Sequence, residues 1–149
     1  MSETGTTLVP YLCCRNANEA IAFYENAFGA ETLGVHKMPD GRVMHAALSI
    51  DGAMVFISDE FPEYGGNSPL ALGGSPVTLH LQVPNSDAVF QRAVEAGCEV
   101  RMPLEDAFWG DRYGMVADPY GHLWSIATHV RDVTPEEMEK ALAEMPVVE

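Results

Sequence analysis

Basic residues are scarce in this sequence. Eight Lys and Arg stand against 22 Asp and Glu, which gives a formal net charge of −14 at pH 7. Nucleic acids and anionic lipids require clustered cations on the protein surface, so the composition excludes both as partners. An acidic surface of this kind either attracts cationic ligands or serves only solubility, and the composition leaves these two interpretations open.

Long apolar segments are missing as well. No stretch approaches the roughly 18 consecutive apolar residues of a membrane span, and the N-terminus lacks a basic region followed by an apolar run. We therefore expect a cytoplasmic protein with no membrane partner. The 149 residues, 47% of them hydrophobic, suffice for one globular domain or for two small modules that share a core.

Cysteine is rare, and no CxxC motif occurs. The three cysteines are Cys13, Cys14 and Cys98. Neighbouring residues on a strand point to opposite faces, so the vicinal pair is poorly placed to close a disulfide. We expect reduced, mostly buried thiols rather than a redox or metal site.

The most informative feature that is present is an internal repeat. Residues 18–31 align with residues 87–99 at an offset of about 68 residues, and Gly29 then pairs with Gly97. In each copy an apolar strand precedes a helix with one apolar face, and three further strands follow. The repeat predicts an α+β fold built from two βαβββ modules.

Turn residues and apolar periodicity set the expected boundaries. They predict a first module at 8–58, a linker at 59–76, a second module at 77–130 and a C-terminal helix at 134–145. Expected strands are 8–14, 32–37, 43–50, 53–58, 77–83, 98–102, 113–117 and 122–129. Expected helix caps are Asn16 or Asn18, Ser86 or Asp87, and a capping box at Thr134.

The linker is rich in Gly and Pro and shows neither the helical nor the strand period. Long irregular loops in compact domains are often functional. Phe61 and Tyr64 either cover a binding site or belong to a passive connection, and the sequence does not decide between the two.

Several motifs add to the repeat. They are Pro10-Tyr11-Leu12, Glu19-Ala20-Ile21-Ala22-Phe23-Tyr24, Trp109-Gly110-Asp111-Arg112-Tyr113-Gly114, Asp118-Pro119-Tyr120-Gly121-His122 and Trp124-Ser125-Ile126-Ala127-Thr128-His129. Together they resemble the vicinal oxygen chelate superfamily, which includes glyoxalase I, extradiol dioxygenases and bleomycin- and fosfomycin-resistance proteins. More narrowly, they resemble its PhnB-like branch. The resemblance implies two curved, mostly antiparallel sheets around an open cup that holds a metal or a ligand.

The resemblance also implies where metal ligands would lie. The superfamily's metal positions fall on Val9, Phe56, Thr78 and Ser125, and none of these is a His, Gln or Glu. Divalent metals need carboxylate, imidazole or thiolate donors. We therefore expect no metal at these positions and no cofactor, and a divalent metal would need a non-standard site, for example at His80.

Strand geometry suggests what else faces the cup. Residues two apart share a face, so Tyr11 lies with Val9, His80 and Gln82 lie with Thr78, and His129 lies with Ser125. His80 is either a hydrogen-bonded core residue or a catalyst or ligand. His122 is expected to be exposed, and His36 and His45 show no constellation.

The segment from Phe108 to Tyr113 combines three aromatic residues with Asp111 and Arg112 at a predicted strand connection. Such a set suits the stacking of a planar or cationic ligand. The alternative is that Trp109 packs beneath the neighbouring module while Asp111 and Arg112 pair with each other. Ser125 and His80 suggest a nucleophile and a base, but no GxSxG motif and no third orienting group is visible. Trp124, on the opposite face, is expected in the core or an interface.

Two functions therefore compete. The first is a bleomycin-resistance-like protein that binds a small organic molecule, with the ligand contacting Tyr11, Phe56, Thr78, His80, Phe108, Trp109, Arg112 and Ser125. The second is a lyase, isomerase or dioxygenase-type enzyme that uses a non-standard metal site or acid–base chemistry of His80 and Tyr11. We also expect a homodimer, because open sheet edges and the apolar stripe of the C-terminal helix need a covering surface.

Overall fold

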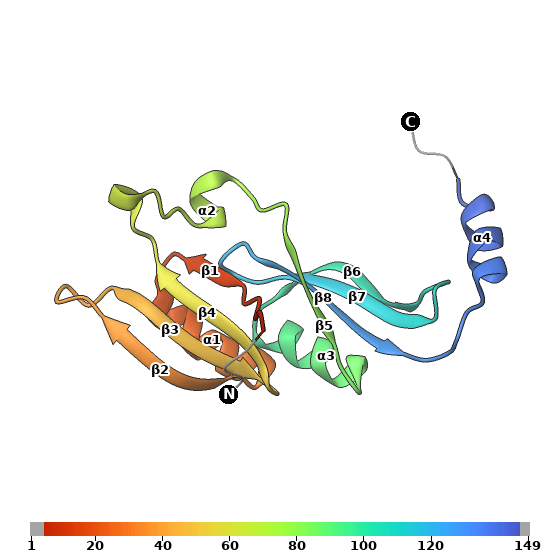
Figure 1. Cartoon of the computed structure of the whole chain (residues 1–149), viewed down its shortest axis with the longest axis horizontal. Helices are drawn as coiled ribbons and strands as arrows, with labels where there is room; N and C mark the ends of the chain where they lie inside the picture. Colours follow the sequence, from red (N-terminus) through yellow and green to blue (C-terminus); the bar gives the residue numbers. More distant parts are fainter. Residues whose placement is uncertain (1–4, 147–149) are drawn as a thin grey trace.

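The computed structural model describes residues 5–146 and contains two βαβββ modules side by side (Figure 1). The first module consists of β1 (Tyr11–Cys14), α1 (Ala17–Phe28), β2 (Glu31–Lys37), β3 (Val43–Ile50) and β4 (Ala53–Asp59). The second consists of β5 (Thr78–Gln82), α3 (Ser86–Ala96), β6 (Glu99–Asp106), β7 (Asp111–Ala117) and β8 (Leu123–His129). The predicted α+β class and the duplicated module are confirmed.

Each module forms its own four-stranded mixed sheet, in the order β1-β4-β3-β2 and β5-β8-β7-β6. The first and last strands of a module pair in parallel, and all other neighbours are antiparallel. The register repeats too: Tyr11 lies opposite Phe56, and His80 lies opposite Ser125. The strands thus form two open sheets, with β1 and β5 at an edge of each.

The last strand of each module holds the start of that module's helix. At the end of β4, Asp59 Oδ1 accepts a hydrogen bond from Ala17 N at 2.8 Å. At the end of β8, Thr128 Oγ1 accepts one from Ser86 N at 2.6 Å. Both contacts satisfy N–H groups that have no partner within the helix, so the two modules repeat this detail as well.

An asparagine caps each of these helices. Asn16 caps α1, as predicted. The predicted caps of α3, Ser86 and Asp87, are wrong: both lie in its first turn, and the side chain of Asn85 accepts from Ala88 N at 3.1 Å. Asn85 has the extended backbone typical of a cap, whereas Ser86 and Asp87 are already helical, which explains why Asn85 is the cap.

The hydrophobic core runs through both modules, because α1 packs against α3. Trp124 of β8 is 1% exposed, and its ring centroid lies 5.7 Å from that of Tyr24 and 4.6 Å from that of Phe28, both on α1. The expectation of a buried Trp124 is confirmed. A helix of the first module and a strand of the second therefore share one aromatic cluster.

A buried carboxylate lies beside this cluster, in the turn between β7 and β8. Asp118 is 5% exposed and accepts four hydrogen bonds, from Tyr24 Oη, Trp124 Nε1 and the backbone N–H groups of Tyr120 and His122. Burial raises the pKa of Tyr24 well above its ordinary value, so the phenol remains a donor. Because Tyr24 belongs to the first module, Asp118 links the two modules within the core.

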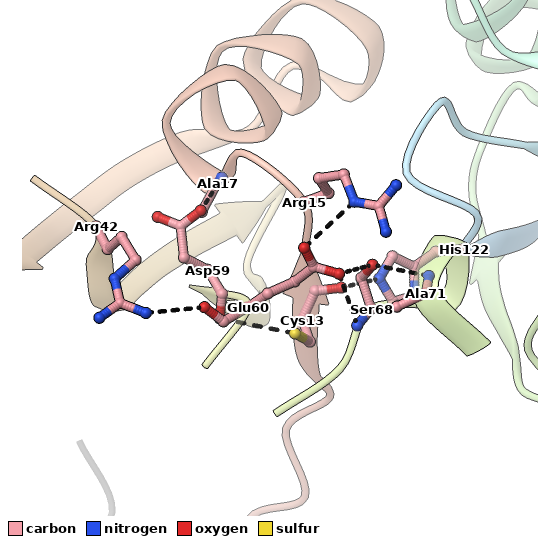
Figure 2. Close-up of polar contacts among 9 residues, drawn as sticks. All are labelled: Cys13, Arg15, Ala17, Arg42, Asp59, Glu60, Ser68, Ala71 and His122. Atoms are coloured by element: carbon pink, nitrogen blue, oxygen red, sulfur yellow. Dashed lines mark hydrogen bonds and ion pairs between the residues drawn. The ribbon is translucent and has the colours of Figure 1, made fainter. Parts of the chain in front are cut away.

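The sequence predicts an exposed His122, and this prediction is wrong. His122 is buried, and its Nε2 lies 2.8 Å from the backbone carbonyl oxygen of Cys13 on β1 (Figure 2). Since β1 is an edge strand, its outer carbonyl groups lack a strand partner. The imidazole takes that place and connects the second module to β1.

The connection between the modules contains a 3₁₀ turn, η1 (Pro62–Tyr64), and a one-turn helix, α2 (Pro69–Leu72). Glu60 holds it to the first module, because its carboxylate accepts from the hydroxyl and N–H groups of Ser68 and pairs with Arg15 at 3.2 Å (Figure 2). The hydrogen bond from Ser68 lowers the pKa of Glu60 and keeps it ionised. The segment is thus fixed by polar contacts despite its irregular sequence.

The two aromatic residues of this connection differ. Phe61 is buried, with the Arg42 guanidinium 4.3 Å from its ring centroid. Tyr64 is 81% exposed. Phe61 therefore has a packing role, which favours the passive interpretation of this residue.

The three cysteines are free thiols, as expected. Burial raises the pKa of Cys98 to about 12 and raises that of Cys14 as well. Burial also raises the pKa of Cys13, which is half buried. The thiolate is the reactive form of cysteine, so these shifts make the three side chains poor nucleophiles.

The C-terminal helix, α4 (Pro135–Ala143), begins with the predicted capping box of Thr134 and Glu137. Figure 1 shows it standing apart from both sheets, and none of its residues is buried. Leu142 and, just beyond the helix, Met145 are about half exposed. None of the helices between residues 5 and 146 is long and apolar enough to cross a membrane.

Candidate functional site

A chain of polar side chains crosses the open face of the second sheet, on the side away from α3. Ser125 Oγ lies 2.7 Å from His80 Nδ1, and His80 Nε2 lies 2.8 Å from Gln82 Oε1. Gln82 Nε2 donates in turn to Asp111 Oδ2 at 3.4 Å. We call the surface formed by His80, Gln82, Asp111, Tyr113, Ser125 and His129 the second-module face.

The carboxylate of Asp111 determines the direction of these hydrogen bonds. An ionised carboxylate only accepts, so Gln82 must turn its NH₂ group to Asp111 and its oxygen to His80. His80 Nε2 must then carry the proton, which leaves Nδ1 of the neutral ring as an acceptor for the Ser125 hydroxyl. The network therefore fixes both the orientation and the tautomer of His80.

Gln82 is the third orienting group that the sequence did not reveal. Ser125, however, is 2% exposed, and an approaching substrate cannot reach its hydroxyl. The serine positions His80 rather than acting as a nucleophile, whereas His80 itself is exposed.

His129 continues the network at the end of β8. Its Nδ1 lies 3.3 Å from Asp111 Oδ1, and its Nε2 lies 2.8 Å from Asp132 Oδ1. The hydrogen bond to Asp132, reinforced by Asp111, raises the pKa of His129 and favours its protonated form. This end of the second-module face therefore presents one imidazole between two carboxylates.

Aromatic rings continue from His80 across the same face. The His80 and Tyr113 rings are nearly parallel, at 16°, with centroids 6.1 Å apart. Trp109 packs edge-on against Tyr113 at 5.4 Å and against Phe108 at 5.0 Å. Trp109 remains 37% exposed, so it is not packed beneath the first module.

Gly110 fixes the turn that carries Phe108 and Trp109. Its carbonyl accepts from Val130 N at 2.8 Å and from Arg131 N at 3.1 Å, which attaches the turn to the chain after β8. Its φ of +101° favours glycine, and an added Cβ would lie 2.2 Å from the Arg131 carbonyl oxygen. Only glycine therefore permits this attachment.

Arg112 points away from the second-module face. It pairs with Asp87 on α3 at 3.1 Å and with Asp106 on β6 at 3.3 Å, and the hydrogen bond that it donates to Asp87 raises the pKa of Arg112. The structure thus separates Arg112 from the other predicted ligand contacts. Asp111 and Arg112 pair with different partners rather than with each other.

The remaining predicted contacts divide between two places. Thr78 and His80 line a cleft of about 510 Å³ between the modules, with Leu8, Pro10, Met54 and Leu79. Its volume falls in the range of small-molecule sites, roughly 300–1,000 Å³. Tyr11 lines a different cleft of about 330 Å³, beside Cys13 and His122. Tyr11 and Phe56 belong to the first sheet, with ring centroids 5.6 Å apart, so the structure does not bring Tyr11 to His80.

Comparison with known proteins places this geometry in a family. The sequence model of the Glyoxalase/Bleomycin resistance protein/Dioxygenase superfamily matches residues 6–126. The chain belongs to this superfamily. An uncharacterized protein of Mycobacterium tuberculosis (strain H37Rv) is 50% identical over 139 residues, which cover 91% of this chain and 82% of that protein.

Solved structures agree with the assignment. TioX from Micromonospora sp. ML1 is 26% identical, with a TM-score of 0.66 over 85% of this chain and 100% of that one. The PhnB protein from Bacillus cereus is 20% identical, with a TM-score of 0.60 over 83% of this chain and 99% of that one. The PhnB likeness concerns the fold alone.

The superfamily's metal positions do not suit a metal in this member. Val9 and Phe56 carry no donor atom, Thr78 offers one hydroxyl, and the Ser125 hydroxyl is already hydrogen-bonded to His80. Divalent metals in proteins prefer imidazole, carboxylate and thiolate ligands.

Proposed function

We propose that this superfamily member binds a small planar organic molecule on the second-module face, without a metal at the four positions. The observation that carries the proposal is the continuous series His80, Tyr113 and Trp109, whose rings contact one another and reach solvent. Aromatic rings favour stacked and edge-to-face contacts with further rings. A planar ligand extends the series, and the neighbouring cleft holds its apolar part.

Charge favours a ligand that donates hydrogen bonds or carries a cation. Asp111 lies at the centre of the face, and Asp132 lies beyond His129 at its end. The chain as a whole carries a formal charge of −14. Carboxylates near an exposed aromatic ring support recognition of an amine or another cationic group.

A second candidate function is acid–base catalysis by His80. The oriented imidazole, held between Ser125 and Gln82, is the observation that favours it. Such a ring moves a proton without a metal, as in a lyase or isomerase. The His80→Ala variant distinguishes the two functions. If the protein is an enzyme, this variant loses turnover and retains most of its substrate affinity. If it is a binding protein, the parent itself shows no turnover.

The binding function is tested by a thermal-shift screen of untagged protein against planar heteroaromatic amines, antibiotics and metabolites. A ligand that binds only the folded state raises the melting temperature by mass action. We expect at least one planar compound to raise the melting temperature. If no compound raises it at millimolar concentration, the proposal is wrong.

Elemental analysis tests the absence of metal at the four positions. We expect no zinc, nickel, iron or manganese that depends on Thr78 or Ser125, because hydroxyl groups are weak donors for these ions. One equivalent of metal per chain that disappears in Thr78→Ala or Ser125→Ala would contradict the expectation.

We further expect a homodimer. Both sheets have open edges, and the apolar residues Leu142 and Met145 are about half exposed. Sedimentation at tens of micromolar is expected to give twice the chain mass of 16.2 kDa. The double variant Leu142→Asp, Met145→Asp should shift the equilibrium toward monomer, whereas Glu139→Ala, on the same helix, should not. A wild-type protein that sediments as a monomer would refute this prediction.

A further inference from the structure

Two histidines that the sequence leaves without partners meet on the open face of the first sheet. His36 on β2 and His45 on β3 are register partners, so their side chains leave the sheet on the same face. Their rings are nearly parallel, at 17°, with centroids 6.4 Å apart. Directly opposite residues of antiparallel strands have Cβ atoms about 4.5–5.5 Å apart, a separation at which two imidazoles reach a common ion.

Tyr11 orients one of these rings. Its Oη lies 2.8 Å from His45 Nδ1 and donates to the carbonyl oxygen of Met44 at 3.3 Å. With the phenol proton directed to Met44, Tyr11 accepts from His45 Nδ1–H, and the lone pair then resides on Nε2. A second hydrogen bond of this kind, which fixes the tautomer, accompanies most histidines that ligate metals.

The backbone supports this arrangement. The register shifts directly after the histidine pair, from His36 opposite His45 to Lys37 opposite Val43, so Met44 has no partner on β2. Such a bulge re-aims the side chains next to it. Phe56 lies edge-on against His45, with centroids 4.7 Å apart, and restricts the movement of that ring. His36 is exposed, and rotation of its side chain adjusts the distance between the two rings.

We propose that His36 and His45 form a two-imidazole site for a divalent transition metal, with Tyr11 as the residue that positions His45. Imidazole suits copper, nickel and zinc, and Cu²⁺ is expected to bind most tightly. Magnesium and calcium prefer oxygen ligands and should not bind. The site is distinct from the four superfamily positions, and it lies on a different sheet from the second-module face. A test of this metal site is therefore independent of a test of the proposed function.

The geometry also predicts a mechanical effect. β2 is an edge strand, and β3 is its neighbour in the sheet. A metal shared by His36 and His45 joins these two strands through their side chains. Bound metal should therefore raise the melting temperature as well as giving a binding signal.

The test is a titration of untagged protein with Cu²⁺ and Ni²⁺ in a non-coordinating buffer, followed by calorimetry and electron paramagnetic resonance. We expect about one Cu²⁺ per chain with nitrogen hyperfine structure, and His36→Ala and His45→Ala should each weaken binding at least about tenfold. Tyr11→Phe, which keeps the ring and removes the hydroxyl, should weaken it by about tenfold. His80→Ala and His129→Ala, on the other sheet, are the matched controls and should bind as the parent does.

Three results would overturn the proposal. They are no Cu²⁺ binding below millimolar concentration, binding that survives in the double variant His36→Ala, His45→Ala, and equal losses in the His80→Ala and His129→Ala controls. The last result would indicate unspecific binding to surface histidines. Circular dichroism of each variant without metal distinguishes lost ligation from lost folding, because His36 is exposed and His36→Ala should fold as the parent does.

Discussion

Replacement of Asp118 by alanine is expected to lower the free energy of unfolding by about 3 kcal/mol or more. The carboxylate is 5% exposed and accepts four hydrogen bonds, two of them from buried side chains, Tyr24 and Trp124. Each buried donor left without a partner costs about 1–3 kcal/mol. Asp118→Asn should also destabilise the protein, because the amide NH₂ group would face another donor.

Urea denaturation followed by circular dichroism measures this effect at one fixed protein concentration, since an oligomer's stability depends on concentration. Asp106→Asn is the matched control: Asp106 makes an exposed ion pair with Arg112, and such pairs are worth at most about 1 kcal/mol. An Asp118→Ala protein whose free energy of unfolding lies within about 1 kcal/mol of the parent value would show that Asp118 does not hold the modules together.

Once a ligand is identified, Trp109→Ala should reduce its affinity at least about fivefold, because it removes a stacking surface worth roughly 1 kcal/mol. His80→Ala should reduce it about tenfold, because it removes a ring contact and leaves Gln82 and Ser125 without their partner. Isothermal titration calorimetry measures both changes.

Arg112→Ala provides the control for these two variants. Arg112 borders the same aromatic residues in sequence but pairs with Asp87 and Asp106 on the helix side of the sheet. The Arg112→Ala variant should therefore bind the ligand with the same affinity as the parent protein. A larger loss in Arg112→Ala than in Trp109→Ala would place the ligand on the opposite side of the sheet.

The sequence predicts the fold closely because the fold is repeated. The strand Val43–Ile50 is predicted with its observed limits, and the capping box of Thr134 starts α4 as expected. Errors occur at element ends, where local signals compete, as with Ser86 and Asn85 at the start of α3. Tertiary contacts such as that of His122 with the β1 edge leave no local signal at all.

The site is predicted only in part. Strand alternation places Gln82 beside His80, but it does not show that the two side chains bond. The predicted strand starts at Tyr113, whereas β7 starts at Asp111. Because residues 111 and 112 belong to the strand, their side chains alternate: Asp111 lies on the second-module face and Arg112 lies on the other side. His36 and His45 are nine positions apart on two strands, and only their register shows that they are partners.

The two tryptophans of the chain allow a direct measurement of whether the ligand lies against Trp109, next to the second-module face. The indole N–H of Trp124 is buried and bonded to Asp118, whereas Trp109 is exposed. A ¹H–¹⁵N correlation spectrum therefore contains two indole signals, which Trp109→Phe assigns. Titration with a compound from the thermal-shift screen should move the Trp109 signal and leave the Trp124 signal in place. An unmoved Trp109 signal at saturating ligand would contradict the account.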